Sequence, residues 1–275
     1  MAQMMAYRDG VYMPKSDIRI GLDDLGFERG FGVFDYMRQL QGRIPFLADH
    51  LERLNHSQSV LNFQKPLDMA HVQEVIQQLV TTNALGDGYV KIMITGKMEN
   101  GIPVPVLTAY QDEWKAYPDT DYSEGVKLII SEYNKPFAEY KTTFYLGSMR
   151  EMVRMQSEKA ADVLFYVGEE VRECARCNIF YVKNGLMYTP LENILLGVTR
   201  KHVIECALQK FMMIEALVTI ERLFQADEVF ISSTTRNIMP ITRIEDRVIG
   251  NGKPGPVTLE LMQMFHQYVN NYGKS

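Results

Sequence analysis

The stretch KAYPDTDYSEG, residues 115 to 125, interrupts the apolar pattern of the chain near its middle. It gathers Pro, Asp, Ser and Gly and has no hydrophobic periodicity, which is typical of a linker. We therefore expect a linker over 116–125 that separates an N-terminal domain, 1–115, from a C-terminal domain, 126–275. A chain of 275 residues is long enough for two moderate domains with a core in each.

Strand and helix patterns occur on both sides of this stretch. Before it, residues 70–82 have the apolar spacing of an amphipathic helix, while 89–95 and 104–110 are rich in strand-forming residues. After it, several strand-like runs are joined by helical patterns over 198–212 and 257–269. The sequence thus predicts a mixed α/β protein.

Composition and charge exclude several classes of partner. The net charge of −5, without any basic block, argues against nucleic acid. No apolar run has the length of a membrane span, and the N-terminus lacks the pattern of a secretory signal. The three cysteines, an odd number, do not suit a disulfide framework, so we expect a cytoplasmic protein.

Two segments have the features of an anion site. In LLGVTRKHVIE, 195–205, Val198 and Thr199 open a predicted helix, where free N–H groups meet the positive end of the helix dipole. A glycine turn with Thr199 near the N-cap remains an alternative. Thr234 and Thr235 end a predicted strand, either as a second clamp on the same anion or only as a polar strand end.

Two further segments carry charged candidates. Arg53, on a predicted helix, could bind phosphate with two parallel hydrogen bonds, although a lone helical arginine is usually a surface charge. Glu173 follows a strand in VRECARCNIF, beside the C-x-x-C pair of Cys174 and Cys177. A redox or zinc role would need a helix after the motif or a second ligand pair, so we expect no metal.

Lys141 lies in EYKTTFYLGSMREM, among aromatic and apolar residues and before a plausible helix over 146–158. It is either a surface charge or a buried amine with a chemical role. A buried lysine, a strand-end glutamate and a phosphate cup are together what pyridoxal 5′-phosphate (PLP) requires.

Seven segments, taken in order, resemble those of the class IV, fold-type IV aminotransferases, a family that contains branched-chain and D-amino acid aminotransferases and aminodeoxychorismate lyase. The resemblance covers nearly the whole chain, and the segments are ERGFGVFDYMR, FLADHLERL, KTTFYLGSM, VRECARCNIF, LLGVTRKHVIE, ADEVFISSTT and GPVT. GFGVFDY and RECARCN look closest to bacterial D-amino acid aminotransferases with a less common active site.

This resemblance implies a fold-type IV protein with a smaller N-terminal α/β domain, a larger β-barrel-like C-terminal domain with flanking helices, and a homodimer whose sites use both subunits. It implies that Lys141 forms the Schiff base with PLP and later moves a proton, while Glu173 pairs with the pyridine nitrogen. The phosphate would be held by the remaining matching residues: Arg53, Val198, Thr199, Thr234 and Thr235.

The sequence departs from the family where the substrate would bind. Phe34 stands where well-known D-amino acid aminotransferases have a tyrosine, and the TGK strand end lacks their carboxylate-binding arginine. Arg29, Lys91 and Arg176 are the candidates to replace it, and Arg176 is the strongest because it shares a loop with Glu173. Alternatively, Arg29 is structural and Lys91 lies on a solvated edge.

The expected function is PLP-dependent transfer of an amino group between a D- or branched-chain α-amino acid and a 2-keto acid such as 2-oxoglutarate. One alternative is aminodeoxychorismate lyase, which eliminates pyruvate and gives 4-aminobenzoate. A second is a regulator that binds PLP without catalysis.

Overall fold

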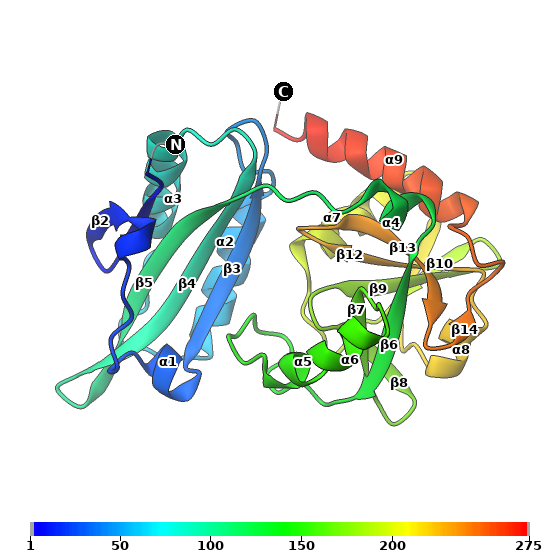
Figure 1. The fold of residues 1–275 in the computed structure, drawn as a ribbon, viewed down its shortest axis with the longest axis horizontal. Helices are drawn as coiled ribbons and strands as arrows, with labels where there is room; N and C mark the ends of the chain where they lie inside the picture. Colours follow the sequence, from blue (N-terminus) through cyan, green and yellow to red (C-terminus); the bar gives the residue numbers. More distant parts are fainter. Residues whose placement is uncertain (1–2, 274–275) are drawn as a thin grey trace. The chain divides into compact units, whose positions relative to one another are not determined.

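The computed structural model describes residues 3–273 and divides the chain into two compact units (Figure 1). The first unit runs to Lys115 and also contains Tyr140–Phe144; the second contains Ala116–Glu139 and Tyr145 onward. Part of the expected linker forms helix α4 (Asp119–Ser123), which packs against strand β13 of the second unit. That the units fold as separate domains, 1–115 and 126–275, stays a prediction.

The first unit contains a five-stranded antiparallel sheet in the order β2-β1-β5-β4-β3. Helices α2 and α3 lie along one face of the sheet (Figure 1). The elements are β1 (Met5–Arg8), β2 (Val11–Pro14), a 3-10 turn (Lys15–Asp17), α1 (Leu25–Arg29), β3 (Gly32–Gln39), α2 (Leu47–Ser59), α3 (Met69–Asn83), β4 (Gly88–Glu99) and β5 (Ile102–Glu113).

Alternation along β4 separates the core of this unit from its other face. Val90, Ile92 and Ile94 are fully buried in the core that α2 and α3 cover. Lys91 therefore projects to the opposite face, because successive side chains of a strand alternate. Its direct partner across β3 is Tyr36, so Phe34, two residues earlier in β3, lies on that same face.

The second unit contains a nine-stranded mixed sheet whose main path is β11-β10-β9-β12-β13-β6-β7-β8, with β14 beside β13. Its strands are β6 (Val126–Glu132), β7 (Asp162–Val167), β8 (Glu170–Cys174), β9 (Asn178–Lys183), β10 (Leu186–Thr189), β11 (Met212–Glu215), β12 (Glu228–Ser233), β13 (Asn237–Ile244) and β14 (Arg247–Val248). Its remaining helices are α5 (Leu146–Arg150), α6 (Met152–Ser157), α7 (Val198–Ala207), α8 (Ile220–Phe224) and α9 (Pro256–Asn271).

Two helices differ from the prediction. The helix expected over 198–212 ends at Ala207, because Met212–Glu215 pair in parallel with β10 instead. The helix expected over 146–158 is two short helices that meet at Glu151. The Ser131 hydroxyl donates to the Glu151 carboxylate over 2.9 Å and ties this junction to β6.

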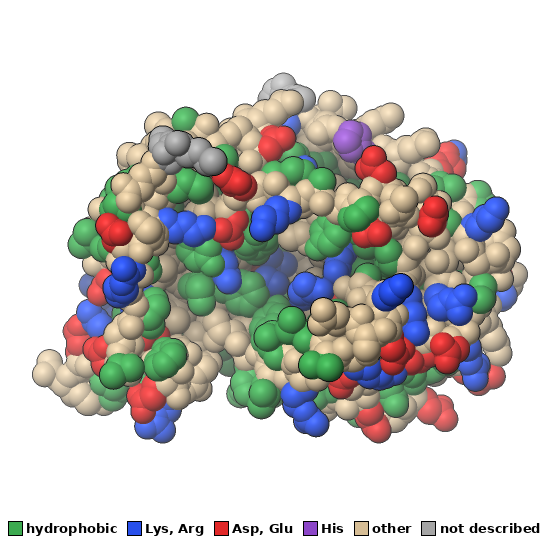
Figure 2. Space-filling model, viewed as in Figure 1, with side chains coloured by type: hydrophobic (Ala, Val, Ile, Leu, Met, Phe, Trp, Pro, Cys, Tyr) green, Lys and Arg blue, Asp and Glu red, His purple; other side chains and the backbone are tan. Residues whose placement is uncertain are grey.

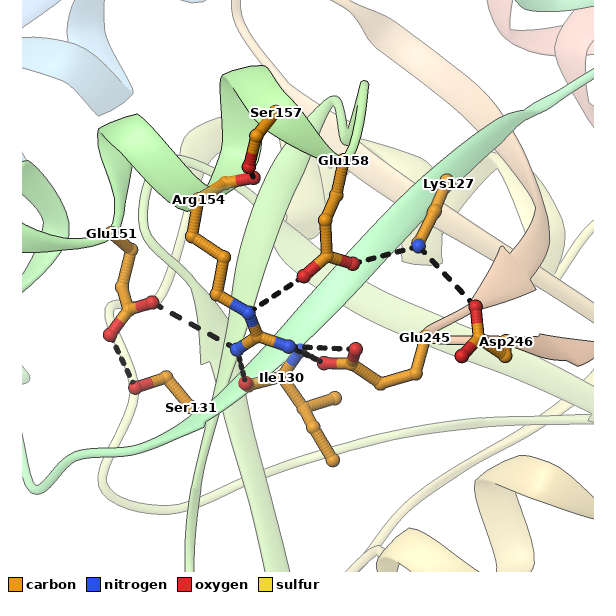
Figure 3. Close-up of polar contacts among 9 residues, drawn as sticks. All are labelled: Lys127, Ile130, Ser131, Glu151, Arg154, Ser157, Glu158, Glu245 and Asp246. Atoms are coloured by element: carbon orange, nitrogen blue, oxygen red, sulfur yellow. Dashed lines mark hydrogen bonds and ion pairs between the residues drawn. The ribbon is translucent and has the colours of Figure 1, made fainter.

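Arg154 attaches α6 to the sheet through a network of charges (Figure 3). Its guanidinium donates to both carboxylate oxygens of Glu245 over 2.7 Å, to Glu158 over 2.9 Å and to the Ile130 carbonyl over 2.9 Å. Lys127 approaches Glu158 at 2.8 Å from β6. Several carboxylates thus share two cations, which fixes α6 beside β6 and the turn after β13.

Within residues 3–273, none of the helices combines the length and the apolar character that a membrane span requires.

Candidate active site

Lys141 is held against the edge of the first unit's sheet. Phe34 N–H donates to the Lys141 carbonyl over 2.9 Å, and Lys141 N–H donates to the Ser57 hydroxyl on α2 over 3.0 Å. The Lys141 ammonium lies 4.7 Å from the centre of the Phe34 ring. Lys141 is half-buried, so the structure supports neither a freely solvated charge nor a fully buried amine.

Arg53 lies in the same unit and pairs with a buried carboxylate. Its Nε and Nη2 donate to the two oxygens of Asp35 over 2.9 and 2.8 Å, and His50 Nδ1 contacts Asp35 at 2.8 Å. Burial opposes ionisation of Asp35, but Arg53 and His50 outweigh it and hold the pKa of this carboxyl well below its usual range. Arg53 Nη1 makes no hydrogen bond with the described residues, so one edge of the guanidinium remains available to an anion.

Lys91 shares the aromatic face with Phe34. Its ammonium lies 5.5 Å from the Phe34 ring centre and 5.8 Å from that of Tyr110. Lys91 lies in β4, between β3 and β5, so the alternative of a solvated edge is wrong. It is half-buried, and burial lowers its pKa although Asp112 opposes the shift. Lys91 forms no ion pair with residues 3–273, and Asp112 acts on its charge only from a longer distance.

Arg29 ends the short helix α1 and has a different setting. Its side chain is 70% exposed and pairs with Glu28 at 2.9 Å. The chain turns at Gly30, which has φ of +66° and closes the helix. The structure therefore gives Arg29 no contact with Lys141 or Lys91.

Glu173, in the second unit, is a buried carboxylate with both oxygens engaged. Oε1 lies 2.8 Å from the Lys135 ammonium, and Oε2 accepts a hydrogen bond from Leu195 N–H over 3.1 Å. Tyr145 is near: burial raises the pKa of its phenol, and the charges of Glu173 and Asp162 raise it further. The sequence did not indicate Lys135 or Tyr145, because both depend on the folded chain for their proximity to Glu173.

The turn that follows Glu173 is short and buried. Cys174 N–H donates to the Cys177 carbonyl over 2.8 Å, and both thiols are free and buried. Burial raises the pKa of Cys174 well above its usual value. No group of three potential metal ligands occurs within residues 3–273. Arg176, between the cysteines, extends outward and contacts Asp162 at 3.3 Å.

Helix α7 begins with an uncapped amino end. Gly197 is its N-cap, and no side chain within residues 3–273 accepts from the first-turn N–H groups. Thr199 lies two residues after this N-cap glycine, as in the alternative of a glycine turn with Thr199 near the N-cap. A Cβ at Gly197 would lie 2.3 Å from the Asn178 side-chain oxygen, so any larger residue would require a shift at this position. Asn178 also donates to the Leu195 carbonyl over 2.7 Å, which fixes the loop before the helix.

The hydroxyl segment at the end of β12 lies beside the start of α7, and we call this place, formed by Gly197, Asn178 and Ser232, the cradle. Ser232 is paired across the sheet with Asn178, the residue that contacts Gly197. The Ser232 hydroxyl is buried and has no hydrogen-bond partner among the residues that the structure describes. Thr234 and Thr235 continue into a half-buried turn, where Thr235 approaches the Ser233 hydroxyl at 3.5 Å. The fold thus brings the two predicted anion segments together.

The chain is similar to known proteins over almost its whole length. It is 28% identical over 263 residues to the D-alanine aminotransferase of Listeria monocytogenes serotype 1/2a (strain 10403S), with 91% of each chain covered. It is 28% identical over 292 residues to the putative branched-chain-amino-acid aminotransferase of Methanocaldococcus jannaschii, with 98% of each covered.

Solved structures share the fold. The T.th. branched-chain amino acid aminotransferase with pyridoxamine 5′-phosphate superposes with a TM-score of 0.90 at 23% identity, covering 100% of this chain and 96% of that one. The enzyme from Escherichia coli gives a TM-score of 0.89 at 22% identity, covering 97% and 95%. The expected fold-type IV architecture is therefore confirmed.

The family described as amino-transferase class IV matches residues 32–244, a range that includes the Lys141, Glu173 and Val198–Thr199 segments. This range is well over half of the chain, so the chain belongs to the class IV aminotransferases.

Proposed function

We propose that the protein is a PLP-dependent aminotransferase that moves an amino group between a D- or branched-chain α-amino acid and a 2-keto acid such as 2-oxoglutarate. The observation that carries this proposal is the cradle at the start of α7. It combines a position where a Cβ would clash at 2.3 Å, first-turn N–H groups without a cap, and the buried, unpartnered hydroxyl of Ser232. These features suit a phosphate group.

PLP, when bound, supplies an electron sink for the bonds at the substrate's α carbon. Val198, Thr199, Thr234, Thr235 and Arg53 would hold its phosphate. Glu173 would keep the ring nitrogen protonated, because the Lys135 ammonium and the Leu195 amide stabilise the charged carboxylate.

Lys141 would provide the amine that attaches to the cofactor and then transfers a proton at the α carbon. Its backbone is fixed by hydrogen bonds to Phe34 and Ser57. Phe34 would cover the amine with an aromatic face. This arrangement suits a lysine that first binds the cofactor and then transfers a proton at the nearby α carbon.

The substrate carboxylate needs a cation. Arg176 is our first choice, because it follows Glu173 in a tight turn and its side chain is 52% exposed. Lys91 is the second choice, because its half-buried ammonium has no ion pair within residues 3–273. Arg29 is the third, since it is exposed and already pairs with Glu28. Replacing Arg176 with Ala should raise KM for amino and keto acids alike without weakening cofactor binding.

We also propose a cytoplasmic homodimer. Exposed apolar side chains gather over α5 and α6 (Figure 2). Leu146, Met149 and Val153 are 62%, 56% and 79% exposed, and such a patch is typical of a surface that a second subunit covers. Three buried, free thiols suit a reducing compartment.

Half-reaction spectroscopy tests the proposed activity. The purified protein should absorb near the visible edge, lose this absorption when D- or L-amino acids of the right class are added, and regain it with 2-oxoglutarate. Borohydride reduction followed by peptide mapping should place the cofactor on Lys141. Attachment to another lysine would contradict its role, and Lys141→Ala is the matched inactive control.

The lyase alternative is favoured by one observation, the half-buried Lys91 on the aromatic face of β4, since lyases of this family often have a lysine in this strand. Release of pyruvate from aminodeoxychorismate without any need for 2-oxoglutarate would establish the lyase. A protein that binds PLP but completes neither half-reaction would instead be the non-catalytic regulator.

A further inference from the structure

Two arginines of the second unit share the same two acceptors. Arg236 Nη1 donates to Asp162 Oδ2 over 2.7 Å, and its Nη2 donates to the Ala161 carbonyl over 2.8 Å. Arg176 approaches the same Asp162 oxygen with Nε and the same Ala161 carbonyl with Nη2, both at 3.3 Å. The shorter distances give Arg236 the stronger hold on Asp162.

The two arginines differ in their exposure to solvent. The side chains of Arg236 and Asp162 are 3% and 0% exposed, whereas that of Arg176 is 52% exposed. Arg236 is covered by the Tyr117 ring, whose centre lies 5.2 Å from the guanidinium, and its Nη1 also approaches Cys177 Sγ at 2.8 Å. Only the Arg176 guanidinium can therefore reach a molecule from solvent.

Arg236 is also joined to the hydroxyl turn. It is the residue after Thr235, and its backbone N–H donates to the Ser233 hydroxyl over 3.3 Å. Burial works against its charge, but Cys177 and Asp162 outweigh this and raise the pKa of Arg236 above its usual value, so the guanidinium stays charged. The turn that contains Thr234 and Thr235 is thus followed by a charged arginine, which contacts Cys177 in the loop after Glu173.

Asp162, Arg176 and Arg236 form a trio of one carboxylate and two guanidiniums. If Arg176 alone faced Asp162, the pair would be neutral and would attract an anion weakly. With Arg236 present, Asp162 is already compensated, and the trio carries one net positive charge that is exposed on Arg176.

We propose that Arg236 is a positioning residue that neutralises Asp162 and so keeps the charge of Arg176 free for the substrate carboxylate. This inference rests on the proposed function, in which Arg176 binds that carboxylate. Arg236 would act through Asp162 and the Ala161 carbonyl, without touching the substrate itself.

The test compares a variant that changes the net charge of the trio with a double variant that restores it. In Arg236→Met the Asp162–Arg176 pair becomes neutral, so KM for the amino and keto acids should rise by about tenfold or more while kcat changes little. Calorimetric binding of succinate, an unreactive dicarboxylate, should weaken in parallel, and the Kd for PLP should not change. The double variant Arg236→Met/Asp162→Asn restores one net positive charge and should recover both KM and succinate binding.

Arg154→Met is the matched control, because it removes a guanidinium from a carboxylate network outside this trio (Figure 3). It should lower the melting temperature without changing KM. A normal KM in Arg236→Met, or a double variant no better than the single one, would overturn the proposal in favour of a purely structural arginine.

Two further outcomes are decisive. If Arg236→Met does not fold, Asp162→Asn alone should keep or lower KM, since it frees the charge of Arg176, and a raised KM would contradict the proposal. If the wild-type protein transaminates no amino acid, the proposed function fails, whereas the succinate series still decides whether Arg236 governs the charge of Arg176.

Discussion

The Lys135 ammonium lies 2.8 Å from Oε1 of Glu173, and the two side chains are 16% and 6% exposed. The second oxygen of Glu173 accepts from Leu195 N–H. A carboxylate this deeply buried depends on its partners, because an isolated buried charge is costly. The Lys135 ammonium and the Leu195 amide are therefore two partners that stabilise the buried Glu173 carboxylate.

Replacing Lys135 with Met should both destabilise the protein and slow it. Breaking a buried ion pair typically costs about 3 to 5 kcal/mol, and the partial exposure of Lys135 places the expected loss near the lower value. Glu173 would tend to take up a proton, so kcat should fall as well. Thermal unfolding and steady-state kinetics measure the two effects. Lys135→Arg is the control, and equal stability of Met and Arg variants would show that the pair contributes little.

Glu173→Gln should keep cofactor binding but lower kcat by at least about tenfold, equivalent to roughly 1.4 kcal/mol in the barrier. The amide cannot hold a proton on the ring nitrogen as a carboxylate does. In a Lys135→Met background, the same change should recover stability, because it removes the buried carboxylate that has lost the Lys135 ammonium. Unchanged turnover in Glu173→Gln would mean that another group protonates the ring.

Gly197→Ala should weaken PLP binding. The added Cβ would lie 2.3 Å from the Asn178 side-chain oxygen, so either the Asn178 side chain or the start of α7 must move. Such overpacking typically costs about 1 to 3 kcal/mol, which corresponds to roughly a five- to 150-fold rise in the Kd for PLP. Gly86→Ala is the matched control, since nothing lies within 4 Å of its Cβ position. Equal PLP affinity in both variants would argue against the cradle.

His50 should make the protein less stable below neutral pH. Burial lowers its pKa; Asp35 opposes this in part, and Arg53 and Lys141 lower it further. The unfolded chain takes up a proton at this histidine near pH 6.5, whereas the folded chain does so only at lower pH. The free energy of unfolding should therefore fall as the pH drops from about 7 to 5.

Chemical denaturation at a series of pH values measures this dependence. His50→Gln should flatten it, while His266→Gln, at an exposed histidine on α9, should leave the slope unchanged. The same slope in the His50 variant and the wild type would assign the dependence to other groups.

The local patterns of the sequence predicted much of the fold. The helix over 70–82 is α3, and the runs at 89–95 and 104–110 lie within β4 and β5. The helix after Gly197 was predicted too long, since its apolar period continues into residues that form β11. Periodicity cannot show where a short segment finds a strand partner, because that partner is distant in sequence.

In the candidate site too, the sequence indicated some residues and not others. Motif order in the sequence pointed to Lys141, Glu173 and Arg176, but it gave no indication of Lys135 or Arg236. Lys135 is 38 residues from Glu173, and Arg236 is 74 residues from Asp162. Both residues form ion pairs only when the second unit is folded. The sequence around a single basic residue in a loop does not show which distant carboxylate it will pair with.

The return of Tyr140–Phe144 to the first unit has a consequence for dissecting the molecule. A cut within 116–125 would give an N-terminal fragment that contains β3, including Phe34, and a C-terminal fragment that contains Lys141. Neither piece would hold the lysine in its native setting, since Phe34 N–H and the Lys141 carbonyl would belong to different polypeptides. The backbone contact that positions Lys141 therefore needs both fragments, and only their reassembly would restore it.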